Sequence, residues 1–290
     1  MNNTDKKYNR LLNKILTEGV WKGNRTGVDC LTIAGFMFEH DMADGFPLLT
    51  SRKLPFKSTK VELEFFIKGL RSKKWLQDRG CKYWNEWCNP QKVAYGHDEA
   101  TKAAMAAEDD LGLVYGTQWR DFHDPEPGQG GDPTHIDQLK KVVETLKKNP
   151  SDRRMIVTAW NPLALDHMAL PACHYGFQVT VIGDKLNLAW NQRSCDVYLG
   201  IPANISSYAL LLHLLAKESG LKEGKLIGFL MDTHIYASHL DQVKEVLTRE
   251  TFPEPRIQTD KFTSIFDWEY SDTELLNYQS GPALSAPVAV

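Results

Sequence analysis

The chain has 290 residues, of which 42% are hydrophobic and 24% are charged, and its formal net charge is -3. This is the composition of a globular protein with a large core, and the charge excludes a nucleic-acid protein held by a general basic field. No stretch approaches the roughly 18 to 20 apolar residues that span a bilayer. The first residues, MNNTDKKYNR, contain no apolar signal core. We therefore expect a cytoplasmic protein with no membrane or DNA partner.

The first half of the chain alternates between helical and strand patterns. Residues 5–18 and 57–69 have helical spacing, the second stretch ending at Gly69, and residues 31–40 alternate as a strand. Residues 89–112 are rich in Ala, Asp, Glu and Lys, which predicts a solvated helical excursion. We interpret this excursion as an insertion.

The second half of the chain continues the alternation. A helix is expected over residues 134–148 with Thr134 as its N-cap, and a buried helix over residues 205–220. The other expected elements are strands at 153–160, 175–183, 185–190 and 225–236 and a surface helix at 238–250. We therefore expect one α/β domain, residues 1–290, around a large sheet.

Cys173 and His174 stand side by side where a polar loop enters an expected strand. A cysteine in this position is a packing residue, a metal ligand or a nucleophile. The five cysteines form no CxxC pair, and the histidines show no repeated spacing. The sequence therefore supports neither a disulfide framework nor a zinc site, and we expect no metal.

Four arginines occur in polar contexts near the ends of expected strands and loops: Arg25, Arg153, Arg154 and Arg193. Each one alone is most simply a solvated surface charge. Together, their guanidinium groups match the oxygens of a nucleotide monophosphate and create a field that favours a thiolate at Cys173.

Several other polar residues stand in apolar company. Glu62 and Asp196 either form buried ion pairs or carry raised pKa values that suit proton transfer. Asn204 either caps the helix that follows it or presents its amide to the O4 and N3–H edge of a uracil. His234 and Tyr236 alternate along a strand and share one face, where they either pack in the core or contact a sugar hydroxyl.

Eight motifs make the pattern specific: RTG, YGTQWR, SDRR, PACHYGFQ, QRSCD, PANISSYALL, DTHIY and a terminal APVAV. They occur in the order found in thymidylate synthases, and the chain resembles that family from about residue 7 to residue 290. The resemblance implies a single domain with a large twisted mixed sheet, flanking helices and a small helical insert. Residues 89–112 look like the small-domain insert of one bacterial branch of the family.

The resemblance implies a set of catalytic residues. Cys173 attacks C6 of dUMP, and C5 then captures the one-carbon unit of 5,10-methylenetetrahydrofolate, the expected co-substrate. Glu62 acts through ordered water on the O4 side, and Tyr115 assists removal of the C5 proton. His174 belongs to the same water network, and Asp196 is placed with the catalytic residues.

The resemblance also implies the binding residues. The phosphate of dUMP is held by Arg25, Arg193 and Ser194, together with Arg153 and Arg154 from the second subunit of an obligate homodimer. The nucleoside is held by Asn204 at the uracil and by His234 and Tyr236 at the 3'-hydroxyl. The folate is bound by Trp84, Asp196, Gly200, Ala203 and Val290.

Four residues depart from the family pattern. Ala172 stands where a proline usually precedes the nucleophile, and Ala203 where an aromatic ring contacts the folate. Met231 replaces a glycine and is expected to bring bulk close to the sugar site, and Gly281 replaces a histidine near the tail. These departures keep open a dUMP hydroxymethylase, in which water rather than hydride reaches the C5 methylene. A non-catalytic nucleotide- or RNA-binding member of the family is the remaining alternative.

Overall fold

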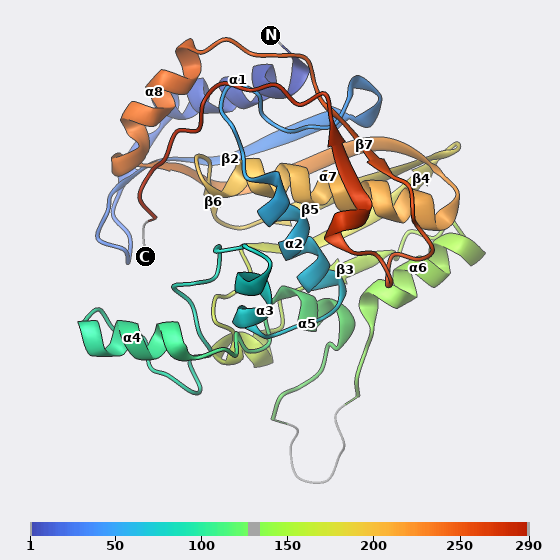
Figure 1. The fold of residues 1–290 in the computed structure, drawn as a ribbon, viewed down its shortest axis with the longest axis horizontal. Helices are drawn as coiled ribbons and strands as arrows, with labels where there is room; N and C mark the ends of the chain where they lie inside the picture. The colour runs from blue at the N-terminus through green and yellow to red at the C-terminus, as the bar shows by residue number, and fades with distance from the viewer. Residues whose placement is uncertain (1, 127–133, 289–290) are drawn as a thin grey trace.

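The computed structural model describes residues 2–126 and 134–288. Its centre is a seven-stranded sheet in the order β1-β2-β7-β5-β4-β3, with β6 paired to β7 (Figure 1). The strands of this sheet are β1 (Val20–Lys22), β2 (Cys30–Asp41), β3 (Ile156–Thr158), β4 (His174–Ile182), β5 (Lys185–Gln192), β6 (Cys195–Asp196) and β7 (Lys222–Tyr236). Strands β5 and β6 run parallel to β7, and the other pairs are antiparallel. The expected large mixed sheet is therefore confirmed, although the strand expected over 153–160 contracts to β3.

Helices flank the sheet, and α2 and α7 lie in front of it in Figure 1. The helices are α1 (Asn3–Glu18), α2 (Phe56–Ile67), α3 (Lys73–Asp78), α4 (Glu99–Ala107), α5 (Tyr115–Arg120), α6 (Gln138–Lys148), α7 (Gly200–Ser219) and α8 (Leu240–Thr248). A small hairpin, β8 (Arg256–Thr259) with β9 (Thr273–Leu276), and short 3-10 turns at Met42–Asp44, Pro162–His167, Ala237–His239 and Tyr270–Asp272 complete the fold. None of the helices within the described residues is long and apolar enough to cross a membrane.

The start of α6 differs from the expectation. Thr134 lies outside the helix, and the N-cap is Asp137, whose carboxylate accepts a hydrogen bond from the backbone N–H of Lys140 at 2.9 Å. Asp and Thr are both good N-cap residues, so composition alone did not separate them. The prediction of Thr134 as the cap was therefore wrong.

Helix α7 is apolar on nearly its whole circumference because it lies between the sheet and α2. Its last turn ends at Gly220, which adopts a left-handed conformation with φ 67°. On the sheet, Phe38, Trp190 and Phe177 occupy one row of neighbouring positions and are buried on the side that α7 covers. This layer forms the core that supports the loops at the end of the sheet.

The opposite face of the sheet carries a row of exposed apolar side chains. They are Met37, Ile156, Ile182, Phe229 and Met231, which are 46–68% exposed. Met37 pairs with Phe229 across β2 and β7, and Ile156 pairs with Gln178 on the same side of the sheet. We call these five residues the outward sheet face. Several exposed apolar side chains on one face of a sheet make that face a candidate protein interface.

The stretch expected to be an insertion contains α4, and it is tied to α3 by a buried lysine. The ammonium group of Lys73 donates hydrogen bonds to the carbonyl oxygens of Met105 at 2.8 Å and Trp87 at 3.1 Å. Both ends of the stretch, Asn89 and Gly112, are buried. The excursion is therefore solvated along its middle and anchored at its ends.

Candidate active site

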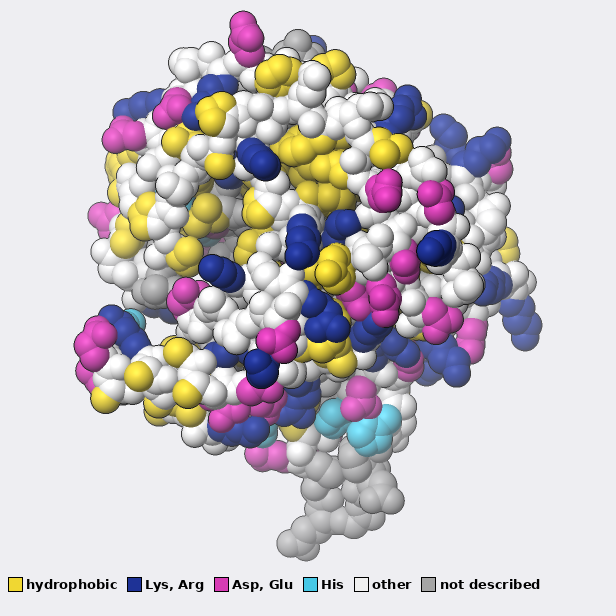
Figure 2. All heavy atoms as spheres, in the orientation of Figure 1, with side chains coloured by type: hydrophobic (Ala, Val, Ile, Leu, Met, Phe, Trp, Pro, Cys, Tyr) yellow, Lys and Arg dark blue, Asp and Glu magenta, His cyan; other side chains and the backbone are white. Residues whose placement is uncertain are grey.

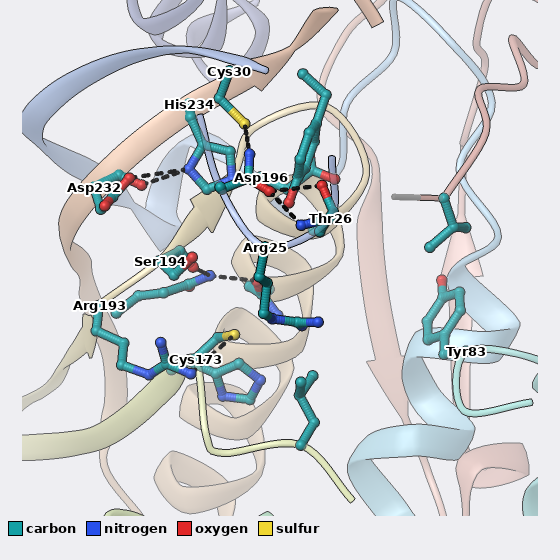
Figure 3. A pocket seen from close by; sticks show the side chains of 18 of the residues that line it. Arg25, Thr26, Cys30, Tyr83, Cys173, Arg193, Ser194, Asp196, Asp232 and His234 are labelled. Carbon is teal, nitrogen blue, oxygen red and sulfur yellow. Dashed lines mark hydrogen bonds and ion pairs between the residues drawn. The ribbon is translucent and has the colours of Figure 1, made fainter. Parts of the chain in front are cut away.

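A pocket of about 400 Å³ opens where the ends of several strands meet α2, α5 and α7 (Figure 3). It is lined by residues from widely separated parts of the chain. The predicted site residues that it contains are Arg25, Glu62, Trp84, Tyr115, Cys173, His174, Arg193, Ser194, Asp196, Gly200, Asn204, His234 and Tyr236. The fold therefore brings most of the predicted site together in one cavity, with a size that suits small ligands.

Three predicted residues within the described part of the chain lie elsewhere. Arg153 and Arg154 are exposed at the turn before β3, and Arg154 forms an ion pair with Asp152 at 2.7 Å. Ala203 is partly buried on α7 but does not line the pocket. Val290 lies outside the described residues, so its predicted role stays a prediction.

Cys173 is the residue just before β4, at the floor of the pocket. Its backbone N–H donates to the hydroxyl oxygen of Tyr115 at 2.8 Å, and its carbonyl accepts from the N–H of Arg193 at 2.9 Å. The nearest guanidinium nitrogen, Nη2 of Arg193, is 4.0 Å from the sulfur. Figure 3 shows the side chains of Arg193 and Arg25 on the same side of the pocket as this thiol.

Burial raises the pKa of the Cys173 thiol, and the positive charges of Arg193 and Arg25 lower it only in part. The predicted cationic surroundings are therefore present, but burial has the larger effect. The neutral thiol is therefore the favoured form.

Arg193 is fixed by the backbone around the thiol. Its Nε donates to the carbonyl oxygen of Ala172 at 3.0 Å, and its Nη2 donates to that of Pro171 at 2.8 Å. The backbone carbonyl of Ala172, a residue that departs from the family pattern, therefore helps to position this guanidinium. Arg25, in contrast, lies on the exposed loop before β2.

Glu62 faces the pocket from α2, where it is buried. Its Oε1 accepts a hydrogen bond of 2.7 Å from the indole N–H of Trp84, so the side chain pairs with a neutral donor rather than with a cation. The buried ion pair considered from the sequence was therefore wrong for Glu62. Burial raises the pKa of Glu62 to about 7, against the smaller lowering effect of the Trp84 hydrogen bond. A carboxyl group with this pKa can both donate and accept a proton near neutral pH.

Tyr115 and His174 stack with their ring centroids 4.2 Å apart. Burial lowers the pKa of His174 to about 3, so its imidazole is neutral, and Nδ1 is 2.9 Å from the hydroxyl of Tyr208. Burial also raises the pKa of Tyr115 well above its ordinary value, so this phenol keeps its proton. These rings give the pocket a rigid and uncharged wall.

Asn204 lies inside α7, which begins at Gly200 with Leu199 in the N-cap position. The capping role considered from the sequence is therefore wrong. The amide is instead held by Gln192, whose Nε2 donates to Asn204 Oδ1 at 3.1 Å, while Trp190 Nε1 donates to Gln192 Oε1 at 3.2 Å. This chain of hydrogen bonds fixes which end of the Asn204 amide carries the oxygen. Sequence reasoning missed Gln192, although it is the first residue of the QRSCD motif.

Asp196, His234 and Tyr236 meet where β6 pairs with β7. Asp196 is opposite His234 in the register, and its Oδ1 accepts from the backbone N–H groups of Tyr198 at 2.9 Å and Leu199 at 3.2 Å. His234 and Tyr236 both line the pocket, as the strand alternation predicted. Asp196 therefore holds the start of α7 in place while its side chain faces the cavity.

The C-terminal segment reaches the pocket through a series of hydrogen bonds. Its carbonyl oxygens at Pro282, Leu284 and Pro287 accept from Arg249 at 2.7 Å, Tyr198 at 2.9 Å and His239 at 2.7 Å. The segment thereby brings Val288 to the pocket wall.

The remaining departures from the family pattern are explained by position. Met231 is 55% exposed on the outward sheet face and does not line the pocket, so the expected crowding of the sugar site was wrong. Gly281 donates its N–H to the carbonyl of Thr50 at 2.8 Å, and a Cβ there would lie 2.5 Å from the carbonyl oxygen of Ser51. A larger residue at 281 requires this part of the chain to shift.

Sequence reasoning missed several residues of the pocket besides Gln192. They are Lys22, Asn24, Thr26, Cys30, Thr32, Tyr83, Trp87, Leu170, Asp232 and Val288. Asn24 and Thr26 flank Arg25 in the NRTG stretch, and Trp87 follows Trp84 by three residues, so proximity to predicted residues was the available signal.

The chain also matches a known protein family. A sequence model described as thymidylate synthase matches residues 6–290. The match spans essentially the whole chain, so the chain belongs to the thymidylate synthase family.

The raised pKa of Glu62 predicts a pH-dependent cost in stability. The unfolded chain releases this proton near the ordinary value of 4.5, whereas the folded chain keeps it up to about pH 7. The stabilisation that the protonated Glu62 side chain gives to the folded state is therefore complete below pH 4.5, and it is lost as the pH rises through about 7. For Glu62→Gln, we expect the free energy of unfolding relative to wild type to be higher at pH 8 than at pH 5 by on the order of 2 to 3 kcal/mol.

Glu64→Gln is the matched control for denaturant unfolding at the two pH values. The Glu64 carboxylate accepts from Lys68 Nζ at 2.5 Å and from the N–H of Tyr270 at 2.8 Å, so we expect its substitution to destabilise the fold at both pH values. An equal effect of Glu62→Gln at pH 5 and pH 8 would contradict the assigned pKa.

Proposed function

From membership of this family and from the contents of the pocket, we propose that the protein is a cytoplasmic thymidylate synthase. It converts dUMP to dTMP, with 5,10-methylenetetrahydrofolate as the donor of both carbon and hydride. The observation that carries the proposal is the convergence in one cavity of a thiol, two guanidinium groups, a carboxyl group with a pKa near 7 and an oriented amide.

The nucleophile is Cys173. Nη2 of Arg193 lies 4.0 Å from the sulfur, and its positive charge favours the thiolate. The thiol proton passes to water as the thiolate adds to C6. The addition moves an electron pair towards C5 and O4, so C5 becomes the atom that takes up the one-carbon unit. The sulfur leaves C6 again in the last step, which restores the free thiol.

Two pocket residues handle protons around this addition. Glu62 exchanges protons with the O4 side of the base through water, which its pKa near 7 permits in both directions. Tyr115 is held beside the nucleophile because its hydroxyl accepts the Cys173 N–H at 2.8 Å. Its raised pKa suits a relay of the C5 proton to water rather than a lasting phenolate.

The substrate is selected by its base and by its phosphate. The Asn204 amide offers one acceptor and one donor, which match N3–H and O4 of uracil, and its orientation is supported by the hydrogen bond from Gln192. Arg25, Arg193 and Ser194 supply a positive and hydrogen-bonding surface for the phosphate. His234 and Tyr236 bind the sugar hydroxyl.

The bound folate supplies the carbon unit and the hydride. Trp84, Asp196 and Gly200 line the part of the pocket assigned to it, and Val288 arrives there with the C-terminal segment. The three hydrogen bonds that fasten this segment support exclusion of water from the reacting methylene. Water exclusion favours transfer of hydride over hydration.

A dUMP hydroxymethylase is the second candidate, and Ala203 favours it. This residue lies on α7 without an aromatic ring and outside the pocket lining. Ala203 lies one helical turn after Gly200, which lines the pocket, so an aromatic ring at position 203 would reach towards the folate and its absence leaves room for water. The fastened C-terminal segment favours thymidylate synthase between the two.

The product of the reaction separates these two functions. We expect the purified protein, incubated with dUMP and 5,10-methylenetetrahydrofolate, to form dTMP and dihydrofolate in equal amounts, measured by nucleotide mass and by the rise in dihydrofolate absorbance. Cys173→Ser, which replaces the thiol by a weaker nucleophile, is expected to lower turnover by several orders of magnitude. A product heavier than dTMP by one oxygen, formed without dihydrofolate, would establish the hydroxymethylase instead.

The proposed active form is a homodimer. The outward sheet face carries exposed apolar side chains, and Ile156 on this face follows Arg153 and Arg154 closely in the chain. Two copies that pack through this face could each lend these two arginines to the other's phosphate site. This arrangement accounts for their position outside their own pocket.

Mixed dimers test this sharing. We expect Cys173→Ser and the double variant Arg153→Ala/Arg154→Ala to be poorly active alone and to regain activity after subunit exchange. The gain should approach about a quarter of wild-type turnover, because half of randomly exchanged dimers are mixed and each mixed dimer has one complete site. Exchange of Cys173→Ser with a triple variant that lacks the thiol and both arginines is the control. Mixed dimers isolated by tag that stay inactive would contradict sharing.

A further inference from the structure

A short β bridge joins the segment after α5 to the segment before α6, at a distance from the pocket lining. Phe122 and Ile136 exchange both backbone hydrogen bonds, at 2.9 and 3.0 Å. In an antiparallel pair, the residues next to such a hydrogen-bonded pair face each other with their side chains closest. His123 and His135 occupy these neighbouring positions, and their ring centroids are 4.7 Å apart.

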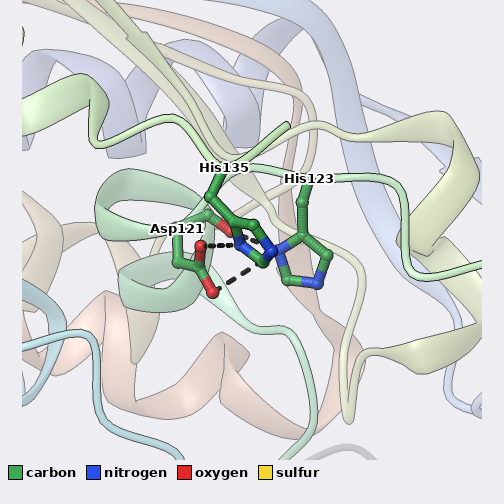
Figure 4. A group of neighbouring side chains, drawn as sticks. All are labelled: Asp121, His123 and His135. Atoms are coloured by element: carbon green, nitrogen blue, oxygen red, sulfur yellow. Dashed lines mark hydrogen bonds and ion pairs between the residues drawn. The ribbon is translucent and has the colours of Figure 1, made fainter. Parts of the chain in front are cut away.

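Asp121 completes this group from the same segment. It precedes His123 by two residues, so the extended chain places both side chains on one side. Its Oδ1 is 2.5 Å from Nδ1 of His135, and its Oδ2 is 3.5 Å from Nδ1 of His123 (Figure 4). One ligand atom from each residue can be chosen so that all three lie within 4.8 Å of one another. Figure 2 shows histidine side chains gathered next to acidic ones on the surface below α5.

We propose that Asp121, His123 and His135 bind a divalent transition-metal ion, with Zn²⁺ as the ion of first choice. Two imidazole nitrogens and a carboxylate oxygen form a ligand set that suits zinc, with water at the fourth position. Ligand atoms at about 2.0 to 2.2 Å from zinc are roughly 3.3 Å apart in a tetrahedron. The three ligand atoms already lie within 4.8 Å of one another, so side-chain rotations that bring them closer complete the site.

The surrounding contacts hold part of this group in place before an ion arrives. The carbonyl oxygen of His123 accepts a hydrogen bond of 2.7 Å from Asn161 Nδ2, and the His123 side chain is 15% exposed. Arg120 and Asp137 form an ion pair of 2.9 Å between the same two segments. His135 is 54% exposed, so an ion can reach the site from solvent.

Metal binding exchanges existing hydrogen bonds for metal–ligand bonds. Nδ1 of His123 faces the carbonyl oxygen of Asp121 at 2.7 Å, and Nδ1 of His135 faces the carboxylate. When these nitrogens bind the ion, each neutral ring keeps its proton on Nε2 instead. The bound ion then links the end of α5 to the start of α6. The proposal is independent of the reaction assigned to the pocket.

This inference departs from the expectation that the protein has no metal. That expectation rested on spacing along the sequence, and the spacing of Asp121, His123 and His135 matches no common zinc motif. Their convergence depends on the β bridge, which is a feature of the folded chain.

Zinc titration of the full-length protein tests the site. The background is Cys173→Ser, so that the reactive thiol does not take up metal, and ZnCl₂ is followed by calorimetry with metal content measured after dialysis. We expect one Zn²⁺ per chain and a rise in the thermal unfolding midpoint that EDTA reverses. His135→Asn and Asp121→Asn should each weaken binding at least about tenfold, because changes next to a metal already cost about 10- to 100-fold.

His97→Asn is the matched control, since His97 is also an exposed histidine, on the stretch that carries α4. It should bind zinc like the background protein. If a variant fails to fold, Co²⁺ added to the background protein gives a second readout, with visible absorption bands of nitrogen and oxygen ligands and no thiolate charge-transfer band. Absence of zinc binding, binding that is unchanged in both site variants, or a thiolate band would overturn the proposal.

Discussion

Burial of ionisable groups where the sheet ends is the constraint on which the rest of the site depends. Removal from water disfavours charge, so it raises the pKa of Cys173, raises that of Glu62 to about 7 and lowers that of His174 to about 3. Burial therefore favours the neutral forms of the Cys173 thiol and the His174 imidazole, and it lets Glu62 change its charge near neutral pH. Arg25 and Arg193 oppose this effect at the thiol, because their positive charges favour the thiolate. In the proposed reaction, the same guanidinium groups also bind the phosphate of the nucleotide.

The scaffold makes this arrangement rigid. Tyr115 contacts the backbone at Cys173, and Gln192 orients the Asn204 amide, so each reacting or reading group is held by a second residue. Such support is what a preorganised site requires, because small displacements of reacting groups lower rates sharply. The C-terminal segment adds Val288 to the wall and is held by side chains that donate hydrogen bonds to its carbonyl oxygens.

Local patterns in the sequence predicted one α/β domain around a large sheet, because alternation and helical spacing report which side chains share a face. The mixed sheet and most of the pocket residues were predicted instead from the resemblance of eight motifs to thymidylate synthases. Residue 231 is odd and residues 234 and 236 are even, so the same alternation places Met231 on the other face of β7 from His234 and Tyr236. This alternation could have corrected the expected contact of Met231 with the sugar. What the sequence could not supply depends on tertiary geometry. The pKa of Cys173 depends mainly on its burial, which requires many segments of the folded chain to pack around it. The contact between His123 and His135 depends on a β bridge between two segments.

The most direct test of this account is the pH dependence of Cys173 alkylation by iodoacetamide, followed by peptide mass spectrometry on the protein without ligand. The account predicts that this thiol titrates above the ordinary pKa of cysteine and that Arg193→Gln or Arg25→Gln moves its pKa further up, since each variant removes a positive charge that opposes burial. A Cys173 pKa below the ordinary value, or one that neither variant changes, would contradict the claim that burial dominates and the two arginines offset it.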